Sequence, residues 1–155
     1  MTKQVLITGG TRGIGRAIAE AFAEAGCQVL ATGIEAELPT AASDQAPIQF
    51  THLDIQQPDQ ISSLVNQFEH LDVLVNCAGT ILRDGKEFTL DGFEQVLDVN
   101  LTGTMRMCTS CLPLLAKQQG CVLNIASMLS YFGSEYAPAY SSSKGGIVQL
   151  TRSLA

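Results

Sequence analysis

The stretch KQVLITGGTRGIG (residues 3–15) decides the fold class of this chain. Residues 3–8 are a short, nearly continuous apolar run with β-branched side chains, which predicts a strand covered on both faces. Glycines follow at positions 9, 10, 13 and 15, and apolar residues then recur at helical spacing as far as Gly26, a residue typical of helix ends. A strand, a glycine-rich turn and a helix in direct succession predict the first unit of a parallel α/β sheet.

The same alternation continues along the chain. Further strands are predicted at residues 27–32, 48–53, 72–76 and 121–126, and further helices at 58–71, at 91–118 and from about residue 138 or 140 onward. Pro113 is expected to kink or restart the helical stretch that contains it. Residues 33–47 hold two prolines and little periodicity, which predicts a loop with at most a short helical piece. This pattern predicts right-handed βαβ crossovers and a doubly wound parallel sheet with helices on both faces.

The composition bounds the class of protein. A chain of 155 residues, 46% hydrophobic and 15% charged, is expected to fold as one domain over residues 1–155. Its net charge of −6, without a cluster of Lys and Arg, argues against nucleic acid as a partner. The amino-terminal apolar run meets a glycine turn at once, without the roughly 20 apolar residues of a membrane span or the small-residue cleavage site of a secretory signal. The five cysteines show no disulfide framework. We therefore expect a cytoplasmic protein with reduced thiols and no membrane partner.

The glycine turn TGGTRGIG (residues 8–15) predicts a phosphate-binding site. Gly9 allows a tight turn, Gly13 lets the backbone approach a pyrophosphate, and Gly15 allows the helix to pack closely on the strand. The helix that follows presents free N–H groups and a positive dipole end to the phosphates. An ordinary glycine-rich turn is the alternative, but the setting between a strand and a helix favours dinucleotide binding.

Polar residues stand at the carboxyl ends of the other strands, where ligands bind in open α/β sheets. Asp54 follows the third strand, NCAG (residues 76–79) follows the fourth, and Ser127 follows the fifth. Tyr140 and Lys144 are four residues apart and share one face of the last helix, so the Lys ammonium would favour the phenolate form of the Tyr. A helix cap or a solvated carboxylate is the alternative for Asp54, and the Tyr–Lys pair taken alone would be a surface packing contact.

In this order and spacing, the glycine turn, NCAG, Ser127 and the Tyr140–Lys144 pair resemble the classical short-chain dehydrogenase/reductase family over the whole chain. The resemblance implies a Rossmann-type sheet with strand order 3-2-1-4-5. Family members usually run about a hundred residues further, so the chain is expected to be truncated at its C-terminus and to lack the last strands of the family. Strand 5 would then be an open edge.

The resemblance also implies the site residues. The catalytic set would be Asn100, Ser127, Tyr140 and Lys144. The cofactor-binding set would be Gly9, Thr11, Arg12, Gly13, Ile14, Gly15, Asp54, Asn76, Ala78, Gly79, Tyr140 and Lys144.

The resemblance gives each of these residues a role. Tyr140 would exchange a proton with the substrate oxygen that Ser127 orients, while Lys144 assists the Tyr and binds the nicotinamide ribose. Asn100, which matches the family's helix-kinking Asn, would hold a relay water, whereas by itself it would be read as a helix cap. Asp54 would contact the adenine ring. Cys77 departs from the family's second Asn in this motif and would remove one polar side chain from the cofactor site.

The choice of cofactor stays open between NAD and NADP. The position of the family's ribose-binding Asp falls on Gly33, which removes the usual signal for NAD. Arg12 would favour NADP by its charge, whereas Glu35 would oppose a 2′-phosphate if it points inward.

The expected function is an NAD(P)-dependent oxidoreductase that acts on a small-molecule secondary alcohol or ketone. The motif residues are most similar to those of deoxygluconate and gluconate 5-dehydrogenases, and the alternative is a 3-oxoacyl carrier-protein reductase-like enzyme. A catalytically silent dinucleotide-binding fragment or assembly unit is the rival from another class. The resemblance also implies a homodimer or homotetramer.

Cysteine and histidine residues give no metal-site signal. The CxxC at residues 108–111 lies in an apolar helix without a second Cys pair or a suitable His, so neither a metal site nor a redox site is expected there. His52 and His70 are isolated and are expected to be surface or structural residues.

Overall fold

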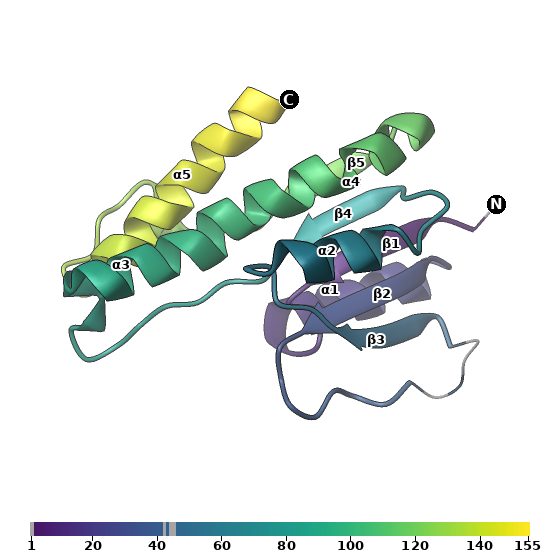
Figure 1. Cartoon of the computed structure of the whole chain (residues 1–155), viewed down its shortest axis with the longest axis horizontal. Helices are drawn as coiled ribbons and strands as arrows, with labels where there is room; N and C mark the ends of the chain where they lie inside the picture. Colours follow the sequence, from purple (N-terminus) through teal and green to yellow (C-terminus); the bar gives the residue numbers. More distant parts are fainter. Residues whose placement is uncertain (1, 42, 44–45) are drawn as a thin grey trace.

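The computed structural model of this protein describes residues 2–41, 43 and 46–155. Five parallel strands form one sheet in the order β3-β2-β1-β4-β5 (Figure 1). The strands are β1 (Gln4–Thr8), β2 (Gln28–Gly33), β3 (Ile48–His52), β4 (Val73–Asn76) and β5 (Cys121–Asn124). The predicted parallel sheet and its strand order are confirmed, and β5 pairs with β4 at one edge.

Helices cover both faces of this sheet. The elements that connect the strands are α1 (Gly13–Glu24), α2 (Pro58–Val65), η1 (Lys86–Phe88), α3 (Leu90–Leu97), η2 (Asp98–Gly103), α4 (Thr104–Gln118) and η3 (Met128–Ser130). The chain closes with α5 (Pro138–Leu154), whose start packs beside α3 at the carboxyl ends of the strands (Figure 1). This arrangement gathers η1, α3, η3 and α5 at the edge of the sheet where a ligand is expected.

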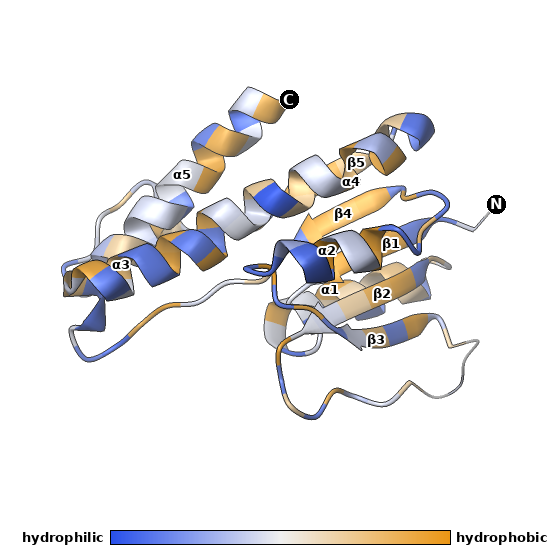
Figure 2. Cartoon of the chain, in the orientation of Figure 1, coloured by the Kyte–Doolittle hydropathy of each residue, from blue (hydrophilic) through white to orange (hydrophobic). Residues whose placement is uncertain are grey.

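The period of two in the strands explains the two layers of core. In β1, Val5 and Ile7 pack toward α1, while Leu6 joins the cluster under α2 and α4. Figure 2 shows the central strands mostly hydrophobic, whereas the helices carry both hydrophobic and hydrophilic residues. Because all three of these β1 side chains are fully buried, a strand of this kind reads as a continuous apolar run rather than an alternating one.

One helix and one strand are shorter than predicted. The helix that begins at Pro58 ends at Val65 instead of residue 71, because Gln67 and Phe68 donate to carbonyls only three residues back and close the last turn. Leu71 then points into the core, fully buried. Strand β5 ends at Asn124 rather than residue 126, and the carbonyl of Ile125 accepts a hydrogen bond from Lys144 Nζ instead of from a strand.

The predicted break at Pro113 was wrong in one respect, because α4 does not restart there and runs through it. Pro113 and Thr109, whose carbonyl loses its intrahelical partner, both lie on the exposed side of the helix. Water can therefore solvate that carbonyl.

The irregularity of the long helical stretch lies upstream instead, in the π-helical segment η2, which contains Asn100. Segments of this kind often mark functional sites.

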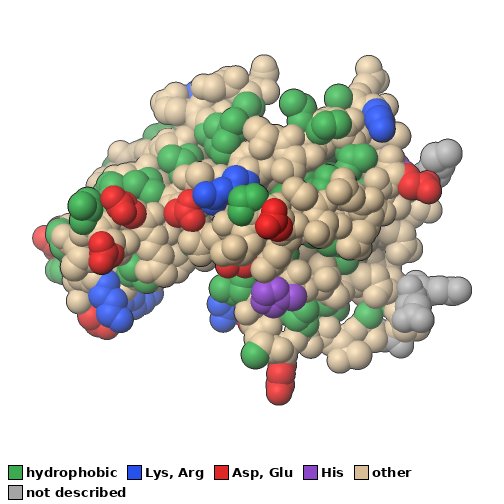
Figure 3. Space-filling view, in the orientation of Figure 1, with side chains coloured by type: hydrophobic (Ala, Val, Ile, Leu, Met, Phe, Trp, Pro, Cys, Tyr) green, Lys and Arg blue, Asp and Glu red, His purple; other side chains and the backbone are tan. Residues whose placement is uncertain are grey.

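The surface charge and the helix lengths bear on the classes of partner. On the face drawn in Figure 3, acidic side chains lie beside the basic ones, so positive charge is not gathered there into one patch. In the part of the chain that the structure describes, every helix is too short or too polar to cross a bilayer.

Candidate active site

A cleft of about 570 Å³ opens at the carboxyl ends of the strands. Its walls come from the glycine turn, from residues 33–35 and 53–56, from residues 77–81, and from α5. The predicted site residues that line it are Gly9, Arg12, Gly13, Ile14, Gly15, Asp54, Ala78, Gly79, Tyr140 and Lys144. Thr11, Asn76, Asn100 and Ser127 were also predicted for the site, but they do not line the cleft.

The glycine turn is built by close backbone approaches. Gly9 has φ +64°, and a Cβ there would stand 2.7 Å from the Cα of Ala78. A Cβ on Gly15 would overlap the carbonyl oxygen of Gly9, whereas one on Gly13 would meet nothing within 4 Å. The turn thus packs tightly against the sheet and leaves its Gly13 side open to the cleft, at the start of α1.

Glu35 turns back toward this turn. One carboxylate oxygen accepts a hydrogen bond from Thr11 Oγ1 at 2.9 Å, and the other lies 3.0 Å from Arg12 Nε. Burial raises the pKa of Glu35, but hydrogen bonds from its own backbone N–H and from Thr11, together with the charge of Arg12, bring it below its ordinary value. The direction of Glu35 was open in the sequence, and in the structure its side chain lines the cleft.

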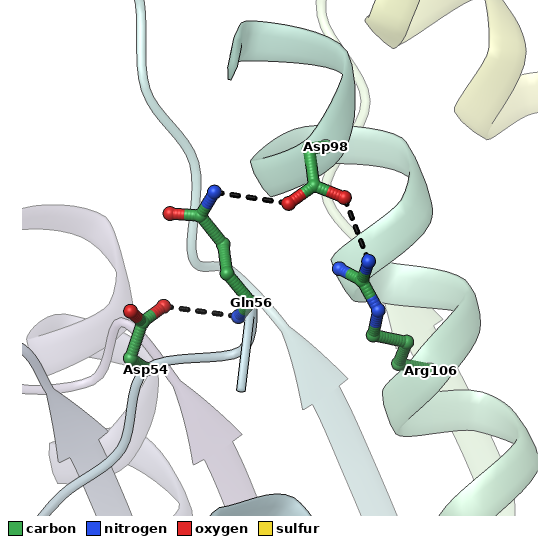
Figure 4. A network of polar contacts seen from close by, with 4 residues as sticks. All are labelled: Asp54, Gln56, Asp98 and Arg106. Atoms are coloured by element: carbon green, nitrogen blue, oxygen red, sulfur yellow. Dashed lines mark hydrogen bonds and ion pairs between the residues drawn. The ribbon is translucent and has the colours of Figure 1, made fainter. Parts of the chain in front are cut away.

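Asp54 sits at the start of a polar chain that joins β3 to the helices (Figure 4). Its Oδ1 accepts from the backbone N–H of Gln56, and the Gln56 side chain donates to Asp98, which pairs with Arg106 at 2.8 Å. The hydrogen bond from Arg106 is the main reason that the pKa of Asp98 lies below its ordinary value, although burial opposes it. This chain of contacts fixes the loop after β3, which forms one wall of the cleft.

Lys144 and Tyr140 occupy the opposite end of the cleft. Lys144 is only 5% exposed, and its Nζ donates to the carbonyl of Ile125 at 2.6 Å. The same Nζ lies 5.7 Å from the centre of the Tyr140 ring, so the predicted proximity of the pair is present. Burial lowers the pKa of Lys144, and the nearby Cys77 opposes that shift. Among the described residues, no protein group bonds the Tyr140 hydroxyl, which leaves it free for a ligand.

Asn100 is locked behind this end of the cleft. Its Oδ1 accepts from the backbone N–H of Thr80, and its Nδ2 donates to the Thr80 carbonyl and to Ser143 Oγ. Both amide protons are therefore used, and the Asn100 carbonyl accepts from the Thr104 hydroxyl. The side chain ties η2 to α5 and to the strand-end loop that carries Gly79.

Ser127 caps the short helix η3. Its Oγ accepts from the Leu129 N–H, and the Ser130 hydroxyl interacts with both the Ser127 N–H and the Lys144 carbonyl. Ser127 is partly exposed, and within the described residues nothing accepts its own proton. The capping box therefore orients the Ser127 hydroxyl while keeping its O–H available as a donor.

Glu87 is a residue of this region that the sequence analysis missed. It is 1% exposed, and its two oxygens accept from the backbone N–H groups of Leu82 and Tyr140 at 3.0 and 2.9 Å. The cap residue of α5, Ala137, offers no side-chain hydrogen bond, and Pro138 has no N–H to satisfy. Glu87 thus acts as a cap from another segment. A lone Glu in a three-residue helix such as η1 gives no sequence signal for such a contact.

The predicted site residue Asn76 and the cysteines that the sequence analysis discussed lie in different surroundings. Asn76 donates to Asn124 and to the sulfur of Cys108, away from the cleft. Cys77 lines the cleft, and burial raises the pKa of its thiol while Lys144 opposes the shift. In the CxxC, burial raises the pKa of both thiols, that of Cys111 to about 12, which disfavours reactive thiolates.

Known proteins that are similar to this chain include dehydrogenases and a reductase. The chain is 36% identical over 160 residues to L-fucose dehydrogenase of Mus musculus, covering 99% of this chain and 59% of the relative. It is 36% identical over 166 residues to a 3-oxoacyl-[acyl-carrier-protein] reductase of Aquifex aeolicus, covering 99% of this chain and 66% of the relative.

Among solved structures, the ligand-free aldohexose dehydrogenase of Thermoplasma acidophilum superimposes with a TM-score of 0.89 at 28% identity, covering 99% of this chain and 60% of that one. The chain thus spans about three fifths of the length of relatives such as L-fucose dehydrogenase. A family model described as short chain dehydrogenase matches residues 3–155, and this protein belongs to the short chain dehydrogenase family.

Proposed function

We propose that residues 1–155 form the dinucleotide-binding domain of an oxidoreductase that interconverts a secondary alcohol and a ketone. Members of the short chain dehydrogenase family use NAD or NADP. The observation that carries the proposal is the cleft itself, because the glycine turn lines one end of it and Tyr140 with Lys144 lines the other. A dinucleotide extended along the cleft would join a phosphate site to a proton donor.

The lining residues fit such a cofactor. The turn at Gly9 and Gly15 leaves no room for side chains, and the start of α1 offers backbone N–H groups to a pyrophosphate. Gly79 lies against the residues of the Tyr140 end, since a Cβ there would stand 3.3 Å from Asn100 Oδ1 and in ordinary contact, 3.8 Å, with Lys144 Nζ. Arg12, Gly13, Ile14, Asp54 and Ala78 would flank the adenosine and pyrophosphate.

The side chains at the other end would handle the proton. A bound nicotinamide supplies the hydride exchange with the substrate carbon. The Tyr140 oxygen would take the proton from the substrate hydroxyl in oxidation and return it in reduction, while the Ser127 O–H would donate to the same oxygen. Lys144 has N–H donors left beside the one that it gives to Ile125, and these would serve the phenolate and a ribose hydroxyl. Asn100 would act as a positioning residue behind them.

A sugar or sugar acid is the substrate class we favour, because relatives named L-fucose dehydrogenase and aldohexose dehydrogenase are among the similar proteins. The deoxygluconate and gluconate type suggested by the motifs is one case of this class. The similarity to a 3-oxoacyl carrier-protein reductase supports a 3-oxoacyl thioester as the second candidate.

The experiment compares Tyr140→Phe with the parent protein on a panel of aldohexoses, L-fucose, sugar acids and a 3-oxoacyl thioester. We expect turnover to fall by roughly 100-fold or more, because the proton donor is lost. Dinucleotide affinity, measured separately by fluorescence titration, should change little. Tyr136→Phe is the matched control, since Tyr136 is exposed and does not line the cleft.

Near-normal turnover by Tyr140→Phe would refute the catalytic assignment. Dinucleotide binding without turnover of any panel member by the parent chain would instead favour the rival proposal, a catalytically silent dinucleotide-binding unit.

We also propose that the protein self-associates and works in the cytoplasm. Met105 and Leu112 on α4 and Leu154 on α5 are exposed apolar side chains, as a subunit contact would require. All five cysteines, each within the described residues, are free thiols, which suits a reducing compartment. Light scattering coupled to size exclusion tests the first proposal, and a single monomer peak would contradict it.

A further inference from the structure

We propose that Glu35 makes this site select NAD over NADP by taking the place of the side chain that Gly33 lacks. The inference rests on the proposed function, since it concerns the adenosine ribose of a dinucleotide in the same cleft. It assigns the carboxylate that reads the ribose to a residue two positions beyond the end of β2.

The first observation is the space at Gly33. A Cβ on Gly33 would overlap Glu35 Oε2 and would stand 2.5 Å from Thr11 Oγ1. The Glu35 carboxylate therefore already fills the volume into which a side chain at the strand end would project. Gly33 provides no acidic side chain at the end of β2, and the carboxylate of Glu35 occupies the space that such a side chain would take.

The second observation is that this carboxylate is held from both sides. Thr11 Oγ1 donates to Oε2, and Arg12 Nε pairs with Oε1. The Glu35 side chain is 28% exposed and lines the cleft, so it is anchored without being sealed off. Thr11 does not reach the cleft itself, and its contribution is to orient Glu35.

The third observation is the charge at this end of the cleft. Among the described lining residues the cations are Arg12 and Lys144, and Lys144 lies at the opposite end beside Tyr140. Arg12 is already paired with Glu35, and Asp54 adds a second carboxylate to the same end. A 2′-phosphate would bring its charge against Glu35, with its nearest cation already neutralised.

The chemistry of the ribose completes the argument. The 2′- and 3′-hydroxyls of NAD are hydrogen-bond donors, and an ionised carboxylate is an acceptor at both oxygens. NADP replaces the 2′ donor by an anion that can only accept, so the same carboxylate attracts one cofactor and repels the other.

The test measures dissociation constants of NADH and NADPH for the 155-residue chain by fluorescence titration, without any substrate. We expect NADH to bind at least about 10-fold more tightly, the difference expected for hydrogen bonds to a charged group. Glu35→Gln keeps the shape and removes the charge, and it should reduce that preference to within about 3-fold. Glu37→Gln, an exposed acid two residues on, should leave the preference unchanged.

Arg12→Gln tests whether Arg12 only pairs with Glu35 or whether its charge also attracts the 2′-phosphate of NADPH. If Arg12 only pairs with Glu35, the substitution leaves NADPH the weaker ligand and does not weaken it further than NADH. Equal or tighter binding of NADPH by the parent chain, or an unchanged preference in Glu35→Gln, would overturn the inference. Binding of neither dinucleotide would refute the proposed function itself, and the inference with it.

Discussion

The two ends of the cleft are built in opposite ways. At the glycine-turn end the lining groups are backbone atoms of the turn and charged side chains near solvent, such as Arg12, whose side chain is 82% exposed. At the Tyr140 end the supporting groups Asn100, Ser143 and Lys144 are all nearly inaccessible; Asn100 donates to Ser143, and Lys144 donates to the carbonyl of Ile125. One end is thus shaped by close backbone approaches beside partly exposed charged side chains, and the other is held by buried polar contacts.

This difference predicts how each end responds to substitution. A buried polar group that loses its partner bears the full cost of desolvation, whereas an exposed group can turn to water. Changes near Arg12 and Glu35 should therefore alter selectivity with little loss of stability. Changes around Tyr140 should unfold or disorder the site before they retune it.

The largest effect is expected for Glu87→Ala. The substitution leaves the backbone N–H groups of Leu82 and Tyr140 without their acceptor, at a cost of about 4 kcal/mol in the free energy of unfolding. Urea denaturation measures it, and Glu94→Ala on the exposed side of α3 is the control, expected within about 0.5 kcal/mol. If both variants lose the same small amount of unfolding free energy, the Tyr140 end of the cleft is not held by buried polar contacts.

A smaller effect is expected at the shape-dependent end, for Gly15→Ala. Its new Cβ would meet the backbone carbonyl of Gly9, which cannot move as a flexible side chain would, so the cost should be about 2–3 kcal/mol. NADH affinity should fall as well, because the turn must shift. Gly13→Ala is the matched comparison, with open space but φ +54°, and should cost about 1 kcal/mol in stability. Equal losses in the two variants would mean that close approach does not shape the turn.

The smallest effect is a pH dependence at Lys144. Burial lowers its folded pKa below the ordinary value of 10.5, so the unfolded chain binds more protons between those two values. The contribution of this group to stability is therefore fully present above 10.5 and is lost as pH falls through the folded pKa.

Lys144→Met should remove that dependence, which cannot exceed about 1.4 kcal/mol per pH unit. The measurement is urea denaturation of both proteins from pH 7 to 10, compared as a difference so that titrating groups not coupled to Lys144 cancel. Parallel curves for the two proteins would contradict the burial argument.

Much of the fold was predictable because its signals are local. The buried strands are short apolar runs, and the glycine turn and the Tyr140–Lys144 spacing each lie within a few residues. The end of α2 at Val65 and the passage of α4 through Pro113 were not predicted, because they depend on where the next strand starts and which side faces water. The strand order came from the family resemblance rather than from the pattern itself.

The supporting contacts of the site were the part that sequence could not supply. Glu35 reaches back 24 positions to Thr11, and Glu87 reaches 53 positions to Tyr140. Neither distance follows a helical or strand period, so only the packed chain brings these groups together. Asn100 was singled out by resemblance, yet its two amide donors serve Thr80 and Ser143, an arrangement that no spacing rule predicts.

The π-helical segment at Asp98–Gly103 sets the rotational phase of one long helical stretch. Before it, α3 faces α5 and the Tyr140 end of the cleft; after it, α4 faces α2 and the sheet. A wide turn inserts about one residue relative to α-helical geometry, which corresponds to a rotation of about 100°. Removing one residue here would rotate the buried face of α4 away from the sheet even if every apolar side chain were kept. The length of this segment thus helps to determine where α3 and α4 stand around the candidate active site.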